Sequence, residues 1–450
     1  MSAGDAARAR RVVILGGGFG GAYCAQALER RVRERDLEIL LIDRNNYFVF
    51  YPLLIEAGTG SLEPRHAVVS LRAFLRRATF RMAEVRGIDA ERRTVCYRRR
   101  HQDGDEHVSY DYLVVALGGV TSLPDVPGLR EFGFSVKALA DAVALRDRAI
   151  EMLELADATE DAAERRARLH FVVVGGNFTG VEVAGELSTF LRQAARGYER
   201  IAADDIQVTL VELTERILRA LGPDLSDYAA TALRCCGVDV RLGESVTRIE
   251  RTRVHLACGG VRPAHTVIWC AGIAPNPLIA RLPFPTDPRG YIVTERDLRV
   301  PGFPAVWAIG DCAANPGPDG APYPATAQHA VRQAAHAARD IARVRRGLPT
   351  RPCNIASQGS LAAIGCRTGV ARVFGVKISG FWAWWLYRSV YLLKMPGLAR
   401  KTRIALDWTI ALLFPREHVQ LSVHARPPAP APERTGPADE RARSLKPTAR

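Results

Sequence analysis

The stretch RVVILGGGFGGAYCAQALERRV at residues 11–32, followed by LEILLID at residues 37–43, decides the fold of the amino-terminal part. Residues 11–16 are an apolar run that enters a cluster of glycines, and the segment after them has the spacing of a helix with one buried face. The second apolar run ends on Asp43. This order predicts a strand, a tight turn, a helix and a second parallel strand, the beginning of a doubly wound α/β sheet.

The glycines of this turn are Gly16, Gly17, Gly18, Gly20 and Gly21, with the spacing GxGxxG at positions 16, 18 and 21. In such a turn the first glycine permits the sharp bend, the second lets the backbone approach a pyrophosphate, and the third lets helix and strand pack closely. Free N–H groups at the helix start would then face the phosphates. Asp43 follows Gly21 by 22 residues, where a carboxylate can accept hydrogen bonds from an adenosine ribose.

The same plan recurs at residues 169–212, where LHFVVVGG, a helical segment and IQVTLVE follow one another and end on Glu212. Two such units predict two Rossmann-like dinucleotide-binding domains. Asn177 replaces the middle glycine of the second motif, and because asparagine tolerates positive φ, we expect the turn to persist. Glu212 lies 32 residues past Gly180 instead of about 20, a difference that a longer helix and connection through Ile201 would absorb. A carboxylate there favours NADH, because it would repel the 2′-phosphate of NADPH.

The remaining apolar runs divide the chain into domains. DYLVVALGGVTSLPDVPGL leads from a strand into a linker rich in glycine and proline, VIWCAGIAPNPL crosses back, and FPAVWAIGDCA precedes another helical segment. We therefore predict a discontinuous first domain at residues 11–137 and 286–360 and a second domain at residues 138–285. We also predict a C-terminal membrane-associating region at 361–424 and a disordered tail at 425–450.

The net charge is +14, carried almost entirely by arginine, since the chain has only five lysines. A basic surface attracts nucleic acid or anionic lipid. No helix-turn-helix, RNA-binding or zinc-finger pattern accompanies the charge, so we expect anionic lipid and no nucleic acid as partner. No apolar run is long enough to span a bilayer, and the first residues do not resemble a signal peptide. The protein is therefore expected in the cytoplasm.

Nine cysteines are scattered along the chain without a CxxC or CxxxxC pair. This pattern fits reduced cytosolic thiols and argues against a disulfide reductase, which needs a redox-active cysteine pair. His329 and His336 share a helical face, but no third ligand accompanies them. We therefore expect no metal, and a flavin can carry out the electron transfer without one.

Residues 380–415 hold four of the six tryptophans, interleaved with basic side chains. A helix drawn through this region places on one face Ile404, Trp408, Ala411 and Leu412. Tryptophan and basic residues around a moderately apolar face favour a helix that lies in a membrane interface. The alternative is an amphipathic segment that packs on the protein's own core or on the partner in a homodimer. We expect a peripheral, monotopic protein at the cytoplasmic face of the cell membrane.

Several segments, taken in order, resemble type II NADH:quinone dehydrogenases. They are NNYFVFYPLLIEAGTG (45–60), YDYLVVALGG (110–119), VVVGGNFTGVEVAGEL (172–187), VIWCAGIAPNPL (267–278), GYIVTERDLRVPGFPAVWAIGDCA (290–313) and YPATAQHAVRQ (323–333). The resemblance runs from about residue 11 to residue 415. It implies a non-covalent FAD that takes a hydride from NADH, followed by two-electron reduction of a membrane quinone without proton pumping.

The resemblance also implies roles for single residues. Glu182 matches a family glutamate near the nicotinamide and the flavin, and Gln328 belongs to the start of the family's AQxAxQ quinone-site motif. The last glutamine position of that motif holds Arg332 here, with Gln333 next to it. The residues implied for FAD are Gly16, Gly18, Gly20, Gly21, Asp43, Tyr51, Pro52, Gly118, Asp311 and Ala327. Those implied for NADH are Gly175, Gly176, Thr179, Gly180, Glu212, Ala271 and Gly272.

Three other functions stay open. A sulfide:quinone oxidoreductase shares the flavin half but needs reactive cysteines near the flavin, and Glu212 with the second glycine motif argues against it. A soluble or peripheral NADH-dependent flavin reductase of another acceptor fits poorly with the aromatic, basic C-terminus. A non-enzymatic redox-sensing protein that binds nucleotide would show no turnover with quinone.

Overall fold

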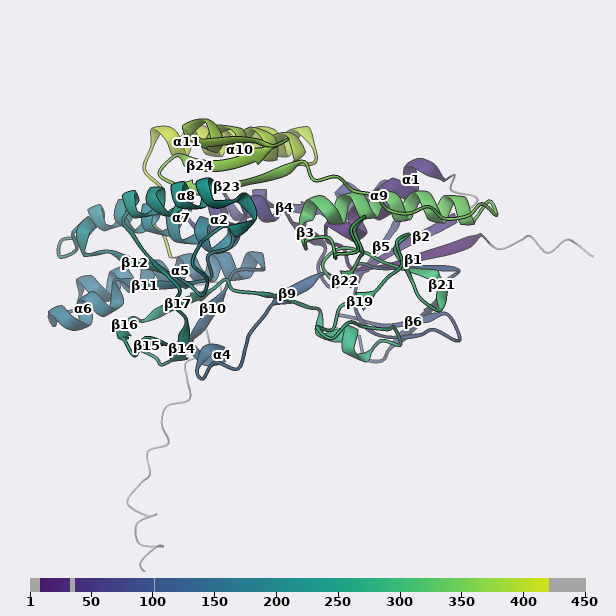
Figure 1. Ribbon diagram of the computed structural model, residues 1–450, viewed down its shortest axis with the longest axis horizontal. Helices are drawn as coiled ribbons and strands as arrows, with labels where there is room; N and C mark the ends of the chain where they lie inside the picture. The colour runs from purple at the N-terminus through teal and green to yellow at the C-terminus, as the bar shows by residue number, and fades with distance from the viewer. Residues whose placement is uncertain (1–8, 33–36, 101, 421–450) are drawn as a thin grey trace, which may run out of the picture.

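The computed structural model describes residues 9–32, 37–100 and 102–420, so the predicted tail at 425–450 lies outside the described residues. Figure 1 shows two α/β bodies side by side and a third layer of two helices and a small sheet across the top of one of them. The fold class is therefore the predicted one, with two Rossmann-like sheets in a single chain.

The first body is built on an eight-stranded sheet. Five of its strands run parallel to their neighbours. Two of these, at residues 10–15 and 112–115, are largely buried apolar runs, as expected for a parallel sheet. In spatial order the strands are β20 (Arg299–Val300), β21 (Phe303–Ala308), β8 (Tyr112–Val115), β1 (Arg10–Leu15), β2 (Leu37–Asp43), β5 (Thr79–Asp89), β6 (Thr94–Arg99) and β7 (Glu106–Ser109).

Two helices, α1 (Phe19–Arg31) and α9 (Ala327–Val344), pack against each other beside this sheet. The backbone N–H of His329 donates to the side chain of Thr326, which caps the start of α9. The side of α9 that faces the core is mostly alanine, so α1 can approach it closely. The buried apolar residues on that side are Ala330, Ala334, Ala337, Ala338 and Ile341.

The second body has a five-stranded sheet with all strands parallel. Its strands, in spatial order, are β10 (Gly133–Ser135), β17 (Thr266–Trp269), β11 (His170–Val174), β12 (Gln207–Glu212) and β13 (Val238–Leu242). Its helices are α5 (Leu139–Asp157), α6 (Ala162–Arg168), α7 (Phe178–Ala194) and α8 (Pro223–Cys235), and a small antiparallel sheet adds β14 (Val246–Ile249), β15 (Arg253–Leu256) and β16 (Val261–Pro263).

The two bodies are joined by an antiparallel ribbon of β9 (Gly119–Thr121) and β18 (Ile273–Pro275). Strand β10, which lies inside the range 11–137 predicted for the first domain, pairs with β17 of the second sheet. Conversely, Ile279, Leu282 and Phe284 pack in the core beneath the first sheet. We therefore propose that the domains divide at this ribbon and not at residues 137 and 285, since both crossings of the chain occur there.

Shorter elements complete the two bodies. The two-stranded pairs are β3 (Tyr47–Val49) with β4 (Val68–Ser70) and β19 (Ile292–Val293) with β22 (Ala313–Ala314). The short α-helices are α2 (Leu54–Gly58), α3 (Leu71–Phe74) and α4 (Leu129–Phe132). The 3-10 turns are η2 (Tyr51–Leu53), η3 (Pro64–Ala67), η4 (Ala195–Gly197), η5 (Ala203–Asp205), η6 (Arg219–Leu221) and η7 (Pro277–Arg281).

The C-terminal layer contains a three-stranded antiparallel sheet that the sequence did not predict, followed by two helices. Its elements are β23 (Gly359–Gly365), β24 (Thr368–Val373), β25 (Val376–Gly380), α10 (Phe381–Lys394) and α11 (Leu398–Leu413). The sheet contacts α7, and α10 packs on the sheet. The predicted membrane-associating region is thus a small folded layer and not a bare amphipathic helix.

The face of α11 predicted to meet the membrane is only partly exposed: Leu412 is 46% exposed, whereas Ile404 and Trp408 pack inward. Ile404 and Trp408 are 0% and 7% exposed and belong to the core of the first body. The opposite face carries Leu406, Ile410 and Leu413, which are 56%, 56% and 73% exposed. Because α11 is apolar on both faces, its sequence could not tell which face would pack inward.

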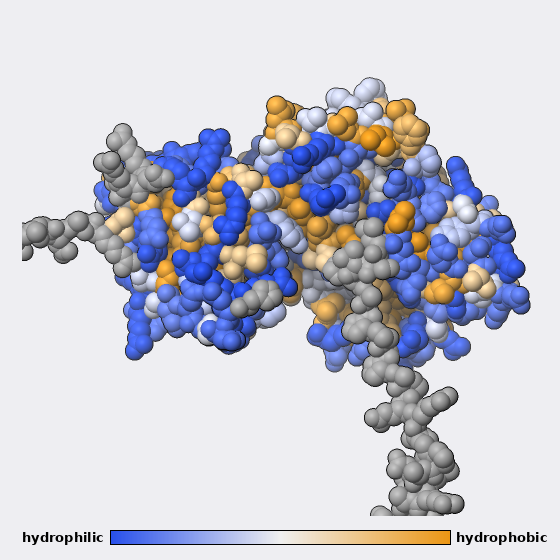
Figure 2. All heavy atoms as spheres, turned by 180° about the vertical axis from the view of Figure 1, so that it is seen from behind, coloured by the Kyte–Doolittle hydropathy of each residue, from blue (hydrophilic) through white to orange (hydrophobic). Residues whose placement is uncertain are grey.

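Large apolar side chains lie exposed along this layer, and Figure 2 shows hydrophobic residues along the upper edge of the molecule, where the layer lies. Among the residues that the structure describes, no helix has the length and apolar content needed to cross a bilayer. An exposed apolar patch of this kind usually marks an interaction surface. We call it the apolar face; its residues are Phe374, Val376, Phe381, Trp382, Trp385, Leu393, Leu398, Leu406, Ile410, Leu413 and Phe414.

Candidate active site

The first glycine turn has the geometry that a bound pyrophosphate needs. Gly16 adopts φ +98°, and a Cβ there would lie 2.2 Å from the carbonyl oxygen of Ala116. A Cβ on Gly21 would lie 1.8 Å from the carbonyl oxygen of Gly16, so helix and turn touch directly. Gly18, at the start of α1, has no atom within 4 Å of its would-be Cβ and leaves that space open. These residues fit the FAD pyrophosphate.

Asp43 ends β2 and closes this turn from the side. Its carboxylate accepts hydrogen bonds from the backbone N–H of Gly17 at 2.6 Å and of Asn45 at 2.7 Å. Burial raises the pKa of Asp43, and these two hydrogen bonds oppose that rise. Gly20, the other glycine of the cluster, faces Ala116 and Ile309 from α1.

The second glycine turn repeats this geometry. Gly175 adopts φ +109° and packs against Ala271, while a Cβ on Gly180 would lie 1.8 Å from the carbonyl oxygen of Gly175. The carboxylate of Glu212 accepts from the N–H of Gly176 at 2.5 Å and from that of Thr214 at 2.8 Å. Glu212 therefore holds the second turn as Asp43 holds the first.

Asn177 keeps the second turn intact for a reason different from the predicted one. Its φ is −78°, close to the −70° of Gly18, so this position needs no positive φ. The side chain instead caps α7: its Oδ1 accepts from the N–H of Gly180 at 3.0 Å, and its Nδ2 donates to the carbonyl of Cys270 at 2.6 Å. The substitution thus ties the start of α7 to the end of β17.

The longer spacing to Glu212 has the predicted cause. Helix α7 has 17 residues, against 13 in α1, and the turns η4 and η5 follow before β12 begins. Thr179 lies half-buried in the first turn of α7. Gly272 adopts φ +77° beside Ser122, where the chain enters the connecting ribbon.

A cluster at the predicted flavin site joins residues far apart in the sequence. The Nζ of Lys137 lies 4.9 Å from the ring centroid of Tyr51 and 3.9 Å from the carboxylate of Asp311. Burial is the main cause that raises the pKa of Tyr51 to about 12, and the charge of Asp311 is the second cause. Burial also raises the pKa of Asp311, against the effect of Lys137. Gly119 lies beside Asp311, and its neighbour Gly118 adopts φ +68°.

The start of α9 is tied to the turn that carries Asp311. Gln333, which is 2% exposed, accepts a hydrogen bond from the N–H of Gly310 at 2.8 Å. Ala327 and Gln328 form the first turn of the helix and are half-buried. Arg332 donates to the carbonyl of Ala356 in the segment that leads to β23. Arg332, which departs from the AQxAxQ pattern, and Gln333, which follows it, therefore hold α9 in place.

Glu182 faces the C-terminal layer and not the second glycine turn. It is 9% exposed, and its carboxylate accepts from the N–H of Ala363 at 3.4 Å. Tyr387 on α10 also hydrogen-bonds to Glu182 and donates to the carbonyl of Pro52 at 2.5 Å. Burial is the main cause that raises the pKa of Glu182 to about 8. Pro52, Tyr387 and Glu182 thus connect the predicted flavin-side turn with α7.

Two further buried glutamates hold the C-terminal layer. Glu56 on α2 lies 3.3 Å from the guanidinium of Arg388, and the indole N–H of Trp408 donates to it. Glu186 accepts from Arg416 at 2.9 Å. These contacts close the layer over α2 and α7 with paired charges, the form in which ionised side chains are stable when buried.

Several site residues escaped the sequence reasoning. Glu56, Tyr387 and Arg388 contact partners more than 200 positions away, which no local pattern reveals. The sequence offered one signal for Lys137, because it is one of only five lysines in an arginine-rich chain.

Two glycine turns, each held by a carboxylate at the end of the next strand, are the arrangement of flavoproteins that bind two dinucleotides. The match to known families agrees with this class. Residues 10–334 match the pyridine nucleotide-disulphide oxidoreductase family, and residues 357–417 match the NDH2 C-terminal domain. The chain belongs to this oxidoreductase family, whose cofactor is FAD, although it has no CxxC or CxxxxC pair.

Similar proteins cover nearly the whole chain. Demethylphylloquinone reductase NdbB of Synechocystis sp. is 32% identical over 406 residues, which are 88% of this chain and 95% of that protein. Type II NADH:quinone oxidoreductase NdhA of Mycobacterium tuberculosis is 31% identical over 420 residues, 90% of this chain and 87% of that protein.

Solved structures share the fold. NDH2 from Plasmodium falciparum in complex with NADH has a TM-score of 0.83 at 20% identity, covering 92% of this chain and all of that one. The sulfide:quinone oxidoreductase from Aquifex aeolicus has a TM-score of 0.67 at 19% identity, covering 91% of this chain and 96% of that one. The first of these likenesses extends into the C-terminal layer, because residues 359–413 are more than the part of this chain that it leaves uncovered.

Proposed function

We propose that this protein oxidises NADH through a bound FAD and reduces a membrane quinone. The observation that carries the proposal is the contact of Tyr387 on α10 with Pro52 at the flavin-side turn. Through it, the layer that bears the apolar face meets the predicted flavin site directly. FAD supplies the redox chemistry, because it accepts a hydride and can pass on two electrons.

NADH would bind at the second glycine turn. Gly175, Gly176 and Gly180 leave the backbone free to approach its pyrophosphate, and Asn177 caps the helix whose N–H groups face it. Glu212 would accept hydrogen bonds from the adenosine ribose and would repel a 2′-phosphate. The protein should therefore prefer NADH to NADPH.

The quinone would enter from the apolar face, on the side of α10. A site beside Pro52 and Tyr387 would lie directly beneath the layer that carries the apolar face. Gln328, at the first turn of α9, can donate or accept a hydrogen bond to a quinone carbonyl. Glu182, whose burial favours the protonated form, lies beside Tyr387 and can hold a proton next to this site.

Rapid mixing separates the two half-reactions. In Gln328→Ala we expect NADH to bleach the flavin at near wild-type rate and quinone to reoxidise it several-fold more slowly, since one hydrogen bond is worth about 0.5–1.5 kcal/mol. Gln193→Ala, on the exposed end of α7, is the matched control. If quinone reoxidises the wild-type flavin no faster than dioxygen does, the proposal is wrong and another acceptor must be sought.

We further propose that the apolar face rests on the cytoplasmic surface of the cell membrane. Exposed tryptophans beside basic residues suit the interfacial region of a bilayer. Leu406→Ser with Ile410→Ser should release the protein from neutral phosphatidylcholine vesicles while its flavin spectrum is retained. A homodimer that buries the same face would instead show as a dimer in detergent-free sedimentation, with no binding to vesicles.

A further inference from the structure

A cavity of about 530 Å³ lies between the end of α1, the segment after α3 and the start of α11. None of the residues predicted to bind FAD or NADH lines it. Its walls are of two kinds. One is basic and consists of Arg30, Arg76, Arg77 and Arg400, whereas the other is apolar and consists of Val69, Ala73, Phe74 and Pro396.

The charges of this cavity are unbalanced. Among the described residues that line it, Glu29 is the one acid, and it is 6% exposed. Its carboxylate is occupied by the backbone N–H groups of Arg76, Arg77 and Ala78, at 2.9, 2.8 and 2.7 Å. Glu29 therefore fixes the loop that carries two of the arginines. Burial, and next the charge of Arg403, lower the pKa of Arg400, as expected for a cation with little compensation.

The cavity opens beside the apolar face. Gly397 lines it, and α11 begins at the next residue, Leu398, which is 81% exposed. Leu393, on the other side of the same turn, is 73% exposed. The first turn of α11 contains no acidic side chain, so its free N–H groups add to the positive potential.

We propose that this cavity binds the headgroup of an anionic phospholipid, with the phosphate among the arginines and the acyl chains along the start of α11. Guanidinium groups recognise phosphate oxygens in pairs, which favours a phosphodiester over a diffuse counterion. The apolar wall and the exposed leucines accommodate the chains of the lipid. This inference rests on the proposed membrane association and names one lipid class that takes part in it.

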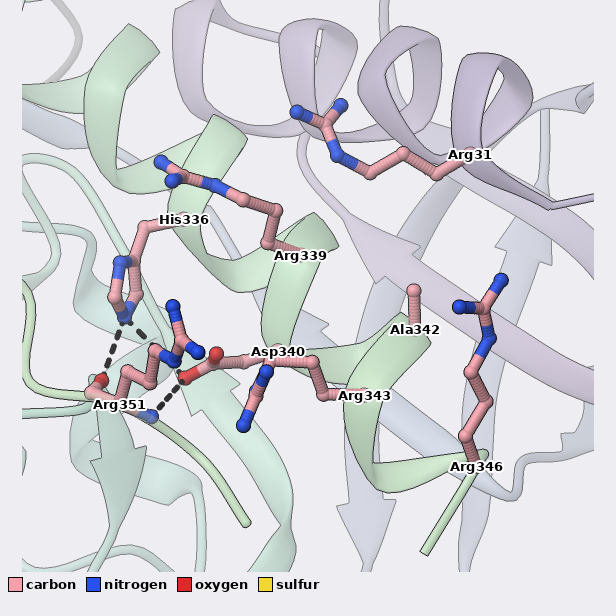
Figure 3. A pocket seen from close by; sticks show the side chains of 8 residues that line it. All are labelled: Arg31, His336, Arg339, Asp340, Ala342, Arg343, Arg346 and Arg351. Atoms are coloured by element: carbon pink, nitrogen blue, oxygen red, sulfur yellow. Dashed lines mark hydrogen bonds and ion pairs between the residues drawn. The ribbon is translucent and has the colours of Figure 1, made fainter. Parts of the chain in front are cut away.

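A second basic cavity provides a comparison within the same molecule. It has a volume of about 300 Å³ and lies between α1 and α9, where Figure 3 shows the arginines of α9 opposite Arg31. Its one acid among the described lining residues, Asp340, is occupied by His336 at 3.3 Å and by the N–H of Arg351 at 3.1 Å. This cavity is at least as basic as the first, with five arginines against four, but among its described lining residues the one apolar side chain is Ala342.

The test measures binding of a soluble short-chain lipid to the FAD-containing holoenzyme. Dioctanoyl phosphatidylglycerol, dioctanoyl phosphatidylcholine and glycerol 3-phosphate are titrated by calorimetry below their micelle-forming concentrations. Two variants that each remove two positive charges are compared. Arg30→Gln with Arg76→Gln changes the proposed site, and Arg339→Gln with Arg346→Gln changes the second cavity.

We expect one phosphatidylglycerol to bind per chain, at least tenfold more tightly than phosphatidylcholine. The variant at Arg30 and Arg76 should weaken this binding roughly tenfold or more, and the variant at Arg339 and Arg346 should leave it within twofold. Equal losses in both variants would mean diffuse attraction and overturn the site. Glycerol 3-phosphate binding as tightly as the lipid would assign the cavity to a free phosphate compound and also overturn it.

Failure of the site is distinguishable from failure of membrane association. Wild-type protein that binds neutral vesicles through the apolar face but shows no preference for phosphatidylglycerol keeps the membrane proposal and loses this one. Wild-type protein that binds no vesicles of any composition loses the membrane proposal itself. If the Arg30 and Arg76 double variant folds poorly, Arg76→Gln alone, at an exposed position, gives the same comparison.

Discussion

Replacing Arg388 by methionine tests how the C-terminal layer is held. The side chains of Arg388 and Glu56 are 12% and 6% exposed, with the guanidinium Nε 3.3 Å from the carboxylate. The guanidinium also lies 4.4 Å from the ring centroid of Trp384 and 4.8 Å from that of Trp408. Methionine keeps most of the apolar stem, but it leaves the carboxylate of Glu56 buried without this cation.

The expected cost follows from these contacts. Removing one member of a buried ion pair costs about 3–5 kcal/mol. The lower end applies here, because the indole of Trp408 still donates to Glu56 and Arg416 still attracts its charge. A free energy of about 3 kcal/mol corresponds to a roughly 150-fold change in an opening equilibrium. The cost should shrink as the pH falls, because Glu56, whose pKa burial already raises, then takes up a proton.

Hydrogen exchange of the amides in α10 and α11, measured on the holoenzyme, reports this opening directly. Each rate is compared with that of the wild type at the same pH, and Arg372→Met, at an exposed position on β24, is the control. Glu56→Gln combined with Arg388→Met should restore most of the protection, because no charge is then left unpaired. Exchange in the Arg388 variant within threefold of wild type at pH 7 would refute the reasoning.

Three further predictions concern the nucleotide sites and the buried acid. Gly21→Ala should prevent folding of the first body, whereas Gly18→Ala should keep the circular dichroism spectrum but lose FAD, measured by flavin absorbance, because its methyl group fills the open space; normal flavin content would contradict this. Because burial raises the pKa of Glu182 to about 8, its contribution to stability falls as the pH rises from about 4.5 to about 8. In Glu182→Gln the fall in Tm between pH 6 and pH 8.5 should be smaller than in wild type. An equal fall would show that Glu182 does not cause this pH dependence. Glu212→Ala should narrow the ratio of kcat/KM for NADH over NADPH, and an unchanged ratio would exclude it as the ribose ligand.

The parts of the fold that the sequence predicted are those in which the deciding contacts are local. A glycine turn, the helix after it and the acid that ends the next strand lie within a few dozen residues, so Gly16 to Asp43 and Gly175 to Glu212 could be recognised as units. Asn177 shows the limit of this reasoning. The turn persists, but through a side-chain cap to Gly180 and not through positive φ.

The parts that it did not predict depend on contacts between distant segments. Glu56 and Arg388 are separated by 332 positions, and each alone resembles an ordinary surface charge. The strands β23 to β25 fall almost entirely within the predicted membrane-associating region, for which the sequence predicted no sheet. In α11, apolar side chains lie on both faces, so the sequence does not determine the inward face; the contact of Trp408 with Glu56 does.

The ribbon that joins the two bodies has a consequence for the order in which the chain folds during its synthesis. All five strands of the second sheet lie between residues 133 and 269, so that sheet can form once this stretch has left the ribosome. The first sheet has to wait for β21, which pairs with β8, and for α9, which covers α1. Nascent chains arrested near residue 300 should therefore resist protease over residues 133–276 while residues 10–115 are still cut. The amino-terminal half of the first body is thus made first but folds last.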